Sequence, residues 1–494
     1  MEHENPASRP AMYALRGVSR ECPENTLVSI RTAICQGYDG VFLDVQVTAD
    51  GVPVLCRNID VSAMSYAEVS RIDAGEAFAH KYRGEMIPKL SDALALCNSA
   101  GLRAWLNMEL VSRDRERDVF LAGEGCSYCF RDVQRLMDTA SAMPEAQLAY
   151  CGKLDDVVLR QISSLGDRLT IWTDQPQLSF LPVGQTRLVV MGVDSYDRLD
   201  EVCSRYAPAA VCTSGVVKPD VRRGFRADVH MHSEYSQDST CPISEICAVA
   251  RDRDFDLVCI TDHCDIRPGH DAVSLLAYRK QTVAGIREKA KNADLQVLVG
   301  VELGGGFLEP ALADRMVAAE DYDSVIGSVH GIMFRGVRQS TANCDFGQMD
   351  MQTTLAYFDG YLDAMLYVAE KLDVDILAHL TYMLRYLNGK YKLDVDWRIR
   401  EDGIRQILSS IIQRGIPLEI NTSCRGGVYD EWLPAKEIVD LYLEMGGYLF
   451  TFGSDAHVSK RIGSYYDEVA DYLRSKGVRY MIYFQKRLAH QYSI

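Results

Sequence analysis

The chain has 494 residues, of which 47% are apolar and 25% are charged. This length corresponds to about two to four domains, and the composition excludes disordered, collagen-like and low-complexity chains. The 69 acidic residues outnumber the 53 basic ones and give a net charge of −16, which disfavours nucleic acids and anionic lipids as partners.

The sequence also bears on the compartment. It contains no apolar run of about 18 residues, and its start lacks the basic and then apolar regions of a signal peptide. The 15 cysteines are an odd number spread along a long chain, which favours reduced thiols over a disulfide framework. We therefore predict a cytoplasmic protein without membrane association.

Short apolar runs alternate with amphipathic helical patterns in the first half of the chain. The runs predicted as strands are residues 11–15, 41–47, 54–56, 103–108, 147–151, 169–172, 188–191 and 209–212. The helical patterns between them include residues 25–35, 90–97, 131–142 and 156–164. About eight alternating units predict a parallel (β/α)8 barrel of the TIM type.

The second half repeats this alternation after a polar linker at residues 218–224. Its predicted strands are residues 226–230, 257–260, 297–301, 324–326, 374–377, 417–420 and 448–452. Helical patterns lie between them, for example at residues 276–290, 355–372, 404–414 and 435–445. The fold class is thus α/β, with two barrels in series and domains at residues 1–222 and 223–494.

Histidines and carboxylates stand at the ends of the predicted strands in the second half. The histidines are His230, His232, His263, His330, His379 and His457, and the carboxylates are Asp238, Glu302 and Asp455. The C-terminal ends of parallel barrel strands open on one face, so these side chains converge there. Imidazole with carboxylate is a ligand set for Zn, Mn or Fe.

These candidate ligands are too many for one metal ion. In His230-Met231-His232 the two-residue period of a strand points both imidazoles the same way, so one ion can take both. A single histidine at a strand end is more often a hydrogen-bonded structural residue, but the joint occurrence favours metal binding. We predict three divalent ions that share bridging carboxylates, a cluster that can deliver hydroxide and clamp a phosphoryl oxygen.

Residues 226–494 resemble the polymerase-and-histidinol-phosphatase (PHP) superfamily, in its histidinol-phosphatase branch. The resemblance rests on the family order of the segments His230-Met231-His232, Thr261-Asp262-His263, Gly300-Val301-Glu302, Ser328-Val329-His330, Ala378-His379 and Gly453-Ser454-Asp455-Ala456-His457. It implies a distorted seven-stranded barrel and hydrolysis of L-histidinol phosphate to L-histidinol and phosphate.

The resemblance also implies how the ligands divide among the ions. His230, His232, Glu302 and Asp455 would hold the first metal, and Glu302 would bridge to a second. The second would be held by His330 and His379, and the third by Asp238, His263 and His457.

Two arginines follow ligand-bearing strands and are candidates for binding the phosphate. The planar guanidinium groups of Arg385 and Arg425 suit a phosphate, although each could instead form a salt bridge on the barrel rim. The leaving alkoxide must be protonated or held by a metal. Asp455 and His457 are candidate general acids only where metal binding leaves one of them free.

Residues 11 to about 222 resemble the glycerophosphodiester phosphodiesterase family, a (β/α)8 barrel, through Arg16-Gly17, the segment 23–27, the segment 44–51 and the segment 87–90. The family's two acid/base histidines and one calcium-binding glutamate are replaced by Leu15, Arg57 and Phe42. Only Arg16, Asp44 and Glu109 remain of the expected set. We therefore expect no phosphodiesterase activity, and a scaffold or dimerisation role.

Alternatives remain open at this point. The first half could sense a phosphate ligand through Arg16 and Arg57. Because metal ligands define a reaction and not its leaving group, the second half could act on a nucleotide or another small phosphate ester. A non-catalytic sensor or interaction protein is the alternative of another class. The sequence leaves homo-oligomerisation open.

Overall fold

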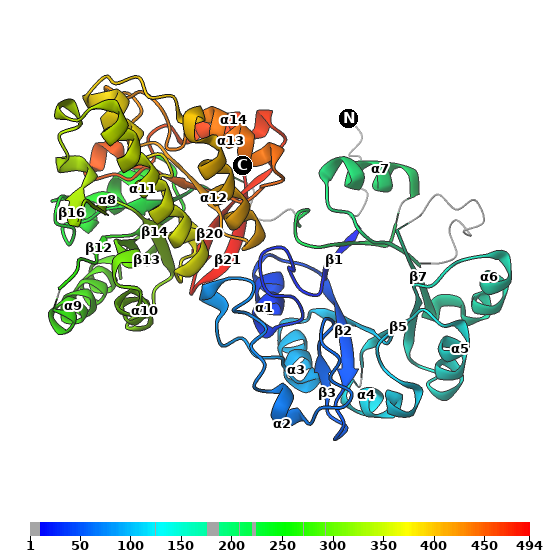
Figure 1. The fold of residues 1–494 in the computed structure, drawn as a ribbon. Coiled ribbons are helices and arrows are strands. Elements are labelled where there is room, and N and C mark those ends of the chain that lie inside the picture. The colour runs from blue at the N-terminus through cyan, green and yellow to red at the C-terminus, as the bar shows by residue number, and fades with distance from the viewer. Residues whose placement is uncertain are drawn as a thin grey trace. The chain divides into compact units, whose positions relative to one another are not determined.

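The computed structural model describes residues 10–123, 125–174, 187–206, 208–219, 224–269, 271–291 and 293–494 (Figure 1). The chain divides into two compact units. The first comprises residues 1–78 and 82–219, and the second residues 79–81 and 220–494. Residues 220–223 of the predicted linker lie outside the described residues.

The first unit contains a closed barrel of parallel strands. In chain order these are β1 (Ala11–Leu15), β2 (Gly40–Val47), β4 (Arg103–Asn107), β5 (Ser127–Phe130), β6 (Gln147–Tyr150), β7 (Leu169–Thr173), β8 (Arg187–Val190) and β9 (Ala210–Thr213). Each pairs with its neighbour, and β1 pairs with both β2 and β9, so that Tyr13 lies opposite Gly40 on one side and Cys212 on the other. The predicted (β/α)8 barrel is confirmed.

One strand of this barrel differs from the expectation. The run at 54–56 forms β3 (Pro53–Leu55), which runs antiparallel to β2 and stays outside the barrel. The turn between β2 and β3 is tight, with Gly51 at φ 82°, and a crossover to a parallel strand needs about a dozen residues or more. The strand that completes the set of eight is β5, which lies between β4 and β6. Its sequence Ser-Tyr-Cys-Phe lacks the aliphatic run that marks the other strands.

Helices follow the strands of the first unit. They are α1 (Leu27–Cys35), α2 (Tyr66–Val69), α3 (Leu90–Ala100), α4 (Glu116–Ala122), α5 (Val133–Ala142), α6 (Asp156–Ile162) and α7 (Tyr196–Tyr206). Thr26, Asp132 and Asp155 cap α1, α5 and α6 by accepting backbone N–H bonds. Inside the barrel, the buried Trp172 ring packs against Tyr13, Phe42 and Trp105.

The second unit contains seven parallel strands in a nearly closed barrel. They are β10 (Ala227–Met231), β11 (Leu257–Ile260), β13 (Gln296–Gly304), β14 (Ser324–Ser328), β17 (Ile376–Leu377), β18 (Leu418–Asn421) and β19 (Phe450–Gly453). The short β12 (His263–Asp265) extends beside β13. At the seam, His232 N donates to the Ala456 carbonyl at 2.9 Å. The predicted second barrel is confirmed.

The helices of the second unit are α8 (Ile243–Asp252), α9 (Ala272–Ala290), α10 (Pro310–Ala318), α11 (Met351–Lys371), α12 (Glu401–Gln413), α13 (Lys436–Glu444) and α14 (Tyr466–Ser475). Two antiparallel hairpins, β15 (Gly331–Phe334) with β16 (Val337–Ser340) and β20 (Tyr480–Gln485) with β21 (Leu488–Ser493), lie outside the barrel sheet. A π-helical turn, η7, covers Arg385–Lys390.

The described residues also form short 3₁₀ turns, which are η1 (His80–Tyr82), η2 (Arg113–Arg115), η3 (Ser163–Arg168), η4 (Gly306–Leu308), η5 (Thr341–Asn343), η6 (Phe346–Gln348), η8 (Trp397–Arg400) and η9 (Ser459–Arg461).

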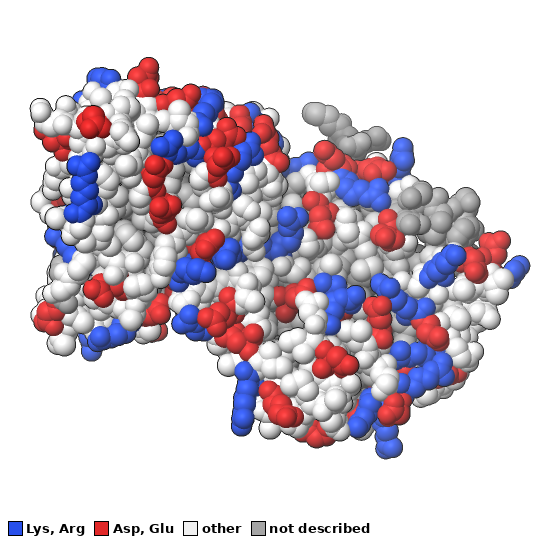
Figure 2. Space-filling view, viewed as in Figure 1, with Lys and Arg blue, Asp and Glu red and all other residues white. Residues whose placement is uncertain are grey.

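Among the described residues, no helix combines the length and the apolar composition needed to span a bilayer. On the face shown in Figure 2, basic and acidic side chains are interspersed over each unit. The acidic excess is therefore not gathered into one patch on this face.

Candidate metal centre

The second barrel brings the nine predicted ligands together at the C-terminal ends of its strands. Their proximity follows from the topology, because the carboxyl ends of parallel strands meet on one face. Four groups of described residues have nitrogen and oxygen atoms within 4.8 Å of one another, and their members are His232, Asp238, His263 and His457; His230, His379 and Asp455; His230, His232 and Glu302; and His263, Glu302 and His330.

The Glu302 carboxylate lies at the centre of this cluster and is 1% exposed. Its Oε1 lies 3.0 Å from His330 Nε2 and 2.9 Å from His379 Nε2. Its Oε2 lies 2.8 Å from His263 Nδ1 and 3.5 Å from the Nε2 atoms of both His230 and His232. Each oxygen of this carboxylate thus faces a different set of imidazoles, as a bridging ligand would.

Two further carboxylates border the cluster. Asp455 Oδ1 lies 3.2 Å from His232 Nε2 and 3.6 Å from His457 Nδ1. Asp238 Oδ2 lies 3.3 Å from His263 Nε2 and 3.2 Å from His457 Nε2. His457 therefore lies between the two carboxylates, at the outer side of the cluster.

The donor set fits divalent metal ions. His230 Nε2 and His232 Nε2 are 3.3 Å apart, and the Nδ1 atoms of these rings are engaged by Glu419 Oε1 at 2.5 Å and Ser236 Oγ at 3.0 Å. A hydrogen bond at Nδ1 orients a metal-binding imidazole and leaves Nε2 for the ion. Glu302 Oε2 and His263 Nδ1 also approach each other without the geometry of a hydrogen bond, which suits a cation shared between them.

The electrostatics of the cluster point the same way. Burial alone would lower the pKa of His330, but the charge of Glu302 and the hydrogen bond to Asp265 outweigh it and raise that pKa to about 9. Burial and the neighbouring His263 lower the pKa of His232 to about 3. Although burial opposes this too, His330, His263 and His230 hold the pKa of Glu302 well below its usual range. The buried carboxylate is therefore an anion surrounded by groups that stabilise negative charge.

The backbone is bent at two of the candidate ligands. His379 has φ 23° and Asp455 has φ 49°, in a region that residues other than glycine rarely adopt. Hydrogen bonds hold both turns: His379 N donates to Glu419 Oε2 at 2.7 Å, and Asp455 N donates to the His230 carbonyl at 2.8 Å. The strain directly after β17 and β19 turns these side chains toward the cluster.

Two residues of this centre were missed in the sequence. Glu419 is fully buried and binds His230, and Asp265 Oδ1 lies 3.2 Å from His330 Nδ1. The signal for Glu419 was a charged residue inside an apolar strand, and the signal for Asp265 was its spacing of two residues from His263. Gly304 leaves room for this pair, since a Cβ there would collide with the Asp265 carboxylate.

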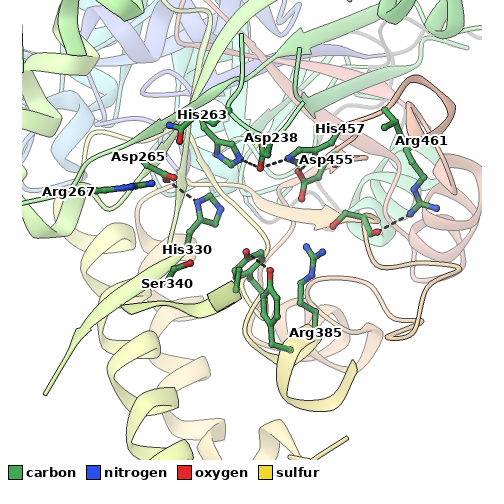
Figure 3. A pocket seen from close by; sticks show the side chains of 16 residues that line it. Asp238, His263, Asp265, Arg267, His330, Ser340, Arg385, Asp455, His457 and Arg461 are labelled. Atoms are coloured by element: carbon green, nitrogen blue, oxygen red, sulfur yellow. Dashed lines mark hydrogen bonds and ion pairs between the residues drawn. The ribbon is translucent and has the colours of Figure 1, made fainter. Parts of the chain in front are cut away.

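A cavity of about 580 Å³ opens beside the cluster (Figure 3). Asp238, Asp455 and His457 line it, together with Arg385, whose guanidinium stacks over the rings of Tyr382 and Tyr386 at 5.4 and 5.3 Å. Arg385 thus lies where a group bound at the cluster would meet it.

Arg425 is not among the described residues that line this cavity. Its guanidinium is bound by Asp430 and, at 3.0 Å, by Glu468, which is the rim salt bridge that the sequence left as the alternative. Arg461 lines the cavity instead, and it donates to the carbonyls of Thr422, Ser423 and Arg425 at 3.1, 3.0 and 3.0 Å. No strand-end pattern indicates Arg461, because it lies in η9, beyond the last candidate ligand.

In the first unit, the residues indicated by the phosphodiesterase resemblance also converge. The buried Asp44 lies 2.7 Å from Arg16 Nε and 3.1 Å from an Arg57 guanidinium nitrogen. The same Arg57 nitrogen is 3.6 Å from Glu109, which also lies 3.3 Å from Arg131. Both carboxylates are therefore already neutralised by guanidinium groups.

Comparison with known families supports both halves of the motif analysis. Residues 228–423 match the PHP domain, and residues 16–124 match the glycerophosphoryl diester phosphodiesterase family. Both resemblances predicted from the sequence are thereby confirmed, at the level of the matched segments.

Curated relatives divide in the same way. The Thermotoga maritima protein named "Probable histidinol-phosphatase" is 27% identical over 267 residues, which cover 53% of this chain and 97% of that protein. The Bos taurus protein named "Glycerophosphodiester phosphodiesterase 1" is 31% identical over 121 residues, which cover 22% of this chain and 37% of that protein. The first relative is matched over nearly its whole length and the second over about a third.

Solved structures also resemble the two halves. One is a histidinol phosphate phosphatase from Lactococcus lactis complexed with Zn, L-histidinol and phosphate; it is 19% identical with a TM-score of 0.44, and the match covers 53% of this chain and 98% of that one. Another is an Oleispira antarctica phosphodiesterase in complex with sn-glycerol-3-phosphate; it is 21% identical with a TM-score of 0.37, and the match covers 42% and 94%.

Proposed function

We propose that the second unit is a metal-dependent phosphomonoester hydrolase, with L-histidinol phosphate as the first substrate to test. The observation that carries the proposal is the convergence of six histidines and two further carboxylates around the buried Glu302. The PHP domain match and the name of the Thermotoga maritima relative support the reaction class and this choice of substrate.

We propose that the cluster holds three divalent ions, Zn, Mn or Fe. The ligands would be His230, His232, Glu302 and Asp455 for the first, Glu302, His330 and His379 for the second, and Asp238, His263 and His457 for the third. Bound divalent ions would lower the pKa of water and neutralise phosphoryl oxygens. His232 and His263 lie within reach of more than one group, so the division among ions rests on the family resemblance.

The remaining cavity residues would position the ester. Arg385 would donate its planar fork to phosphoryl oxygens, and stacking on Tyr382 and Tyr386 would hold that fork in place. Asp455 and His457 line the cavity, and one of them would protonate the leaving alkoxide only where metal binding leaves it free.

Phosphate release from L-histidinol phosphate by the full chain, reconstituted with Mn, Fe or Zn, tests this proposal. The panel includes nucleotides and sugar phosphates. We expect kcat/KM of about 10⁴ M⁻¹s⁻¹ or more for a good substrate and loss of turnover in Asp455→Asn. Asp294→Asn, at a side chain that is 79% exposed and paired with Arg251, is the matched control. Absence of turnover on every ester with metals bound would refute the proposal.

For the first unit we propose a non-catalytic role, as a scaffold or dimerisation module. Its barrel lacks a histidine at the positions where the phosphodiesterase resemblance expects them, and Arg57 lies between Asp44 and Glu109. Arg16 and Arg57 are both bound to Asp44, which disfavours the alternative of a phosphate sensor. The full chain should release no alcohol from glycerophosphocholine with or without calcium.

A further inference from the structure

The wall of the cavity carries three arginines and three aspartates besides its histidines. Arg267, Arg385 and Arg461 line it, and within the described part of the chain none of them forms an ion pair with a carboxylate. In Figure 3, Arg267 lies beyond Asp265 on one side of the cluster, whereas Arg385 and Arg461 lie on the other side. The guanidinium groups are therefore not gathered around a single position.

Arg267 has a second arginine beside it. Arg338 lies on β16 two residues before Ser340, which lines the cavity, so the two-residue period of a strand puts Arg338 on the same face. Burial first, and then the neighbouring charge of Arg267, lower the pKa of Arg338, whereas the charge of Asp265 opposes this shift. The Nε atoms of both are buried without a hydrogen-bond partner among the described residues.

One carboxylate faces the two guanidinium groups. Asp265 lies on the same wall and its charge raises the pKa of Arg338, but its Oδ1 is engaged by His330. Asp238 and Asp455, the other lining carboxylates, face imidazoles. Two guanidinium groups held together with unused buried donors cost free energy unless an anion satisfies them.

We propose that Arg267 and Arg338 form a second anion subsite, which binds a carboxylate or phosphate group of the same ligand whose phosphoryl group lies at the metal centre. This inference rests on the proposed function for the position of the phosphoryl group. The substrate class is then a phosphomonoester with a second anionic group. L-histidinol phosphate carries a cationic tail instead, so the subsite makes it a poorer substrate than an ester with an anionic tail.

Ligand binding can be measured without turnover. Isothermal titration of the full, Mn-loaded chain with 3-phosphonopropionate, propane-1,3-bisphosphonate and propylphosphonate compares a carboxylate, a second phosphonate and no second anion on one carbon chain. The C–P bond is not hydrolysed. We expect the two ligands with a second anionic group to bind at least about tenfold more tightly than propylphosphonate, as a charge-assisted hydrogen bond predicts.

Arg267→Gln and Arg338→Gln should each reduce this preference severalfold or more, and Arg267→Lys should retain part of it. Arg335→Gln is the matched control, because Arg335 is exposed on the same hairpin, where it donates to Thr353 Oγ1 at 3.0 Å. Equal binding of the three ligands by the unaltered chain, or a preference that survives both Gln variants, would overturn the subsite.

Turnover separates this inference from the proposed function. 3-Phosphoglycerate and glycerol 3-phosphate differ in a carboxylate against a neutral hydroxymethyl group, and we expect the first to have the lower KM. A preference for ligands with a second anionic group, without hydrolysis of any ester, would support the subsite and refute the proposed phosphatase. Hydrolysis with a lower KM for glycerol 3-phosphate or L-histidinol phosphate than for 3-phosphoglycerate would support the phosphatase activity and refute the subsite.

Discussion

Glu419 offers a sharp test of the metal centre, because it touches two proposed ligands without being one. Its Oε1 lies 2.5 Å from His230 Nδ1, and its Oε2 accepts from His379 N at 2.7 Å and from Asn421 Nδ2 at 3.2 Å. Glu419→Gln keeps the shape of the side chain but replaces one acceptor oxygen by an NH2 donor.

Neither orientation of that amide restores the original contacts. With its oxygen toward His230, the NH2 group faces the donors of His379 and Asn421. With its NH2 toward His230, the ring must carry its proton on Nε2, and the lone pair that faces His232 and Glu302 is lost. Each outcome forfeits a charge-assisted hydrogen bond of about 1.5–3 kcal/mol, which corresponds to about a 10- to 100-fold loss of metal affinity.

Competition with a calibrated zinc chelator at fixed pH measures this loss. Glu288→Gln is the control, since Glu288 is 69% exposed and pairs only with a surface lysine in the described residues. Thermal unfolding of the metal-free variants shows whether the fold is retained. A Glu419→Gln protein that folds and binds zinc as tightly as the unaltered chain would refute the reasoning that Glu419 positions His230.

Three further predictions concern pH, backbone room and packing. The pKa of His330 in the metal-free protein is about 9, and a ligand imidazole must lose its proton, so metal affinity should rise as the pH rises toward 9. Titration calorimetry of metal binding in two buffers at pH 7 should therefore show proton release. Metal binding without proton release would contradict this prediction. Gly304→Ala, whose Cβ would collide with Asp265, should weaken zinc binding in the same chelator assay, and unchanged affinity would count against the Asp265–His330 pair. Trp172→Ala should destabilise the first unit by about 3–5 kcal/mol in urea unfolding followed by circular dichroism, whereas a loss below about 1 kcal/mol would mean that the barrel interior does not depend on this ring.

Much of the fold could be predicted because the strands are apolar and evenly spaced. The ranges 257–260 and 11–15 coincide with β11 and β1. The exchange of β5 for β3 shows the limit of that signal: Ser127–Phe130 is a barrel strand without an aliphatic run, while Pro53–Leu55 is apolar but belongs to a hairpin. Apolar pattern reports burial, and both segments are largely buried, so pattern alone does not tell which of them joins the barrel.

The candidate site, like the fold, could be predicted from the sequence only in part. Positions at strand ends were predictable, because parallel topology carries all of them to one face. Pairings between side chains were not, since they depend on which loops approach each other. Arg425 follows β18 and Arg461 follows β19, both at the face of the cluster. Glu468 and Asp430 bind the first, whereas backbone carbonyls and the Tyr465 ring hold the second. Nothing in the spacing of these residues distinguishes them.

The two barrels show how the cation partners of a carboxylate decide its chemistry. Glu302 is surrounded by imidazoles and Asp44 by guanidinium groups, and both carboxylates are buried on a parallel strand of their barrel. An imidazolium can release its proton near neutral pH and leave a lone pair for a metal, so the charge around Glu302 is exchangeable. A guanidinium keeps its proton and has no lone pair to offer, so the charge around Asp44 is permanent. A divalent ion can therefore replace protons in the second barrel, but in the first it would have to displace Arg16 and Arg57 from Asp44.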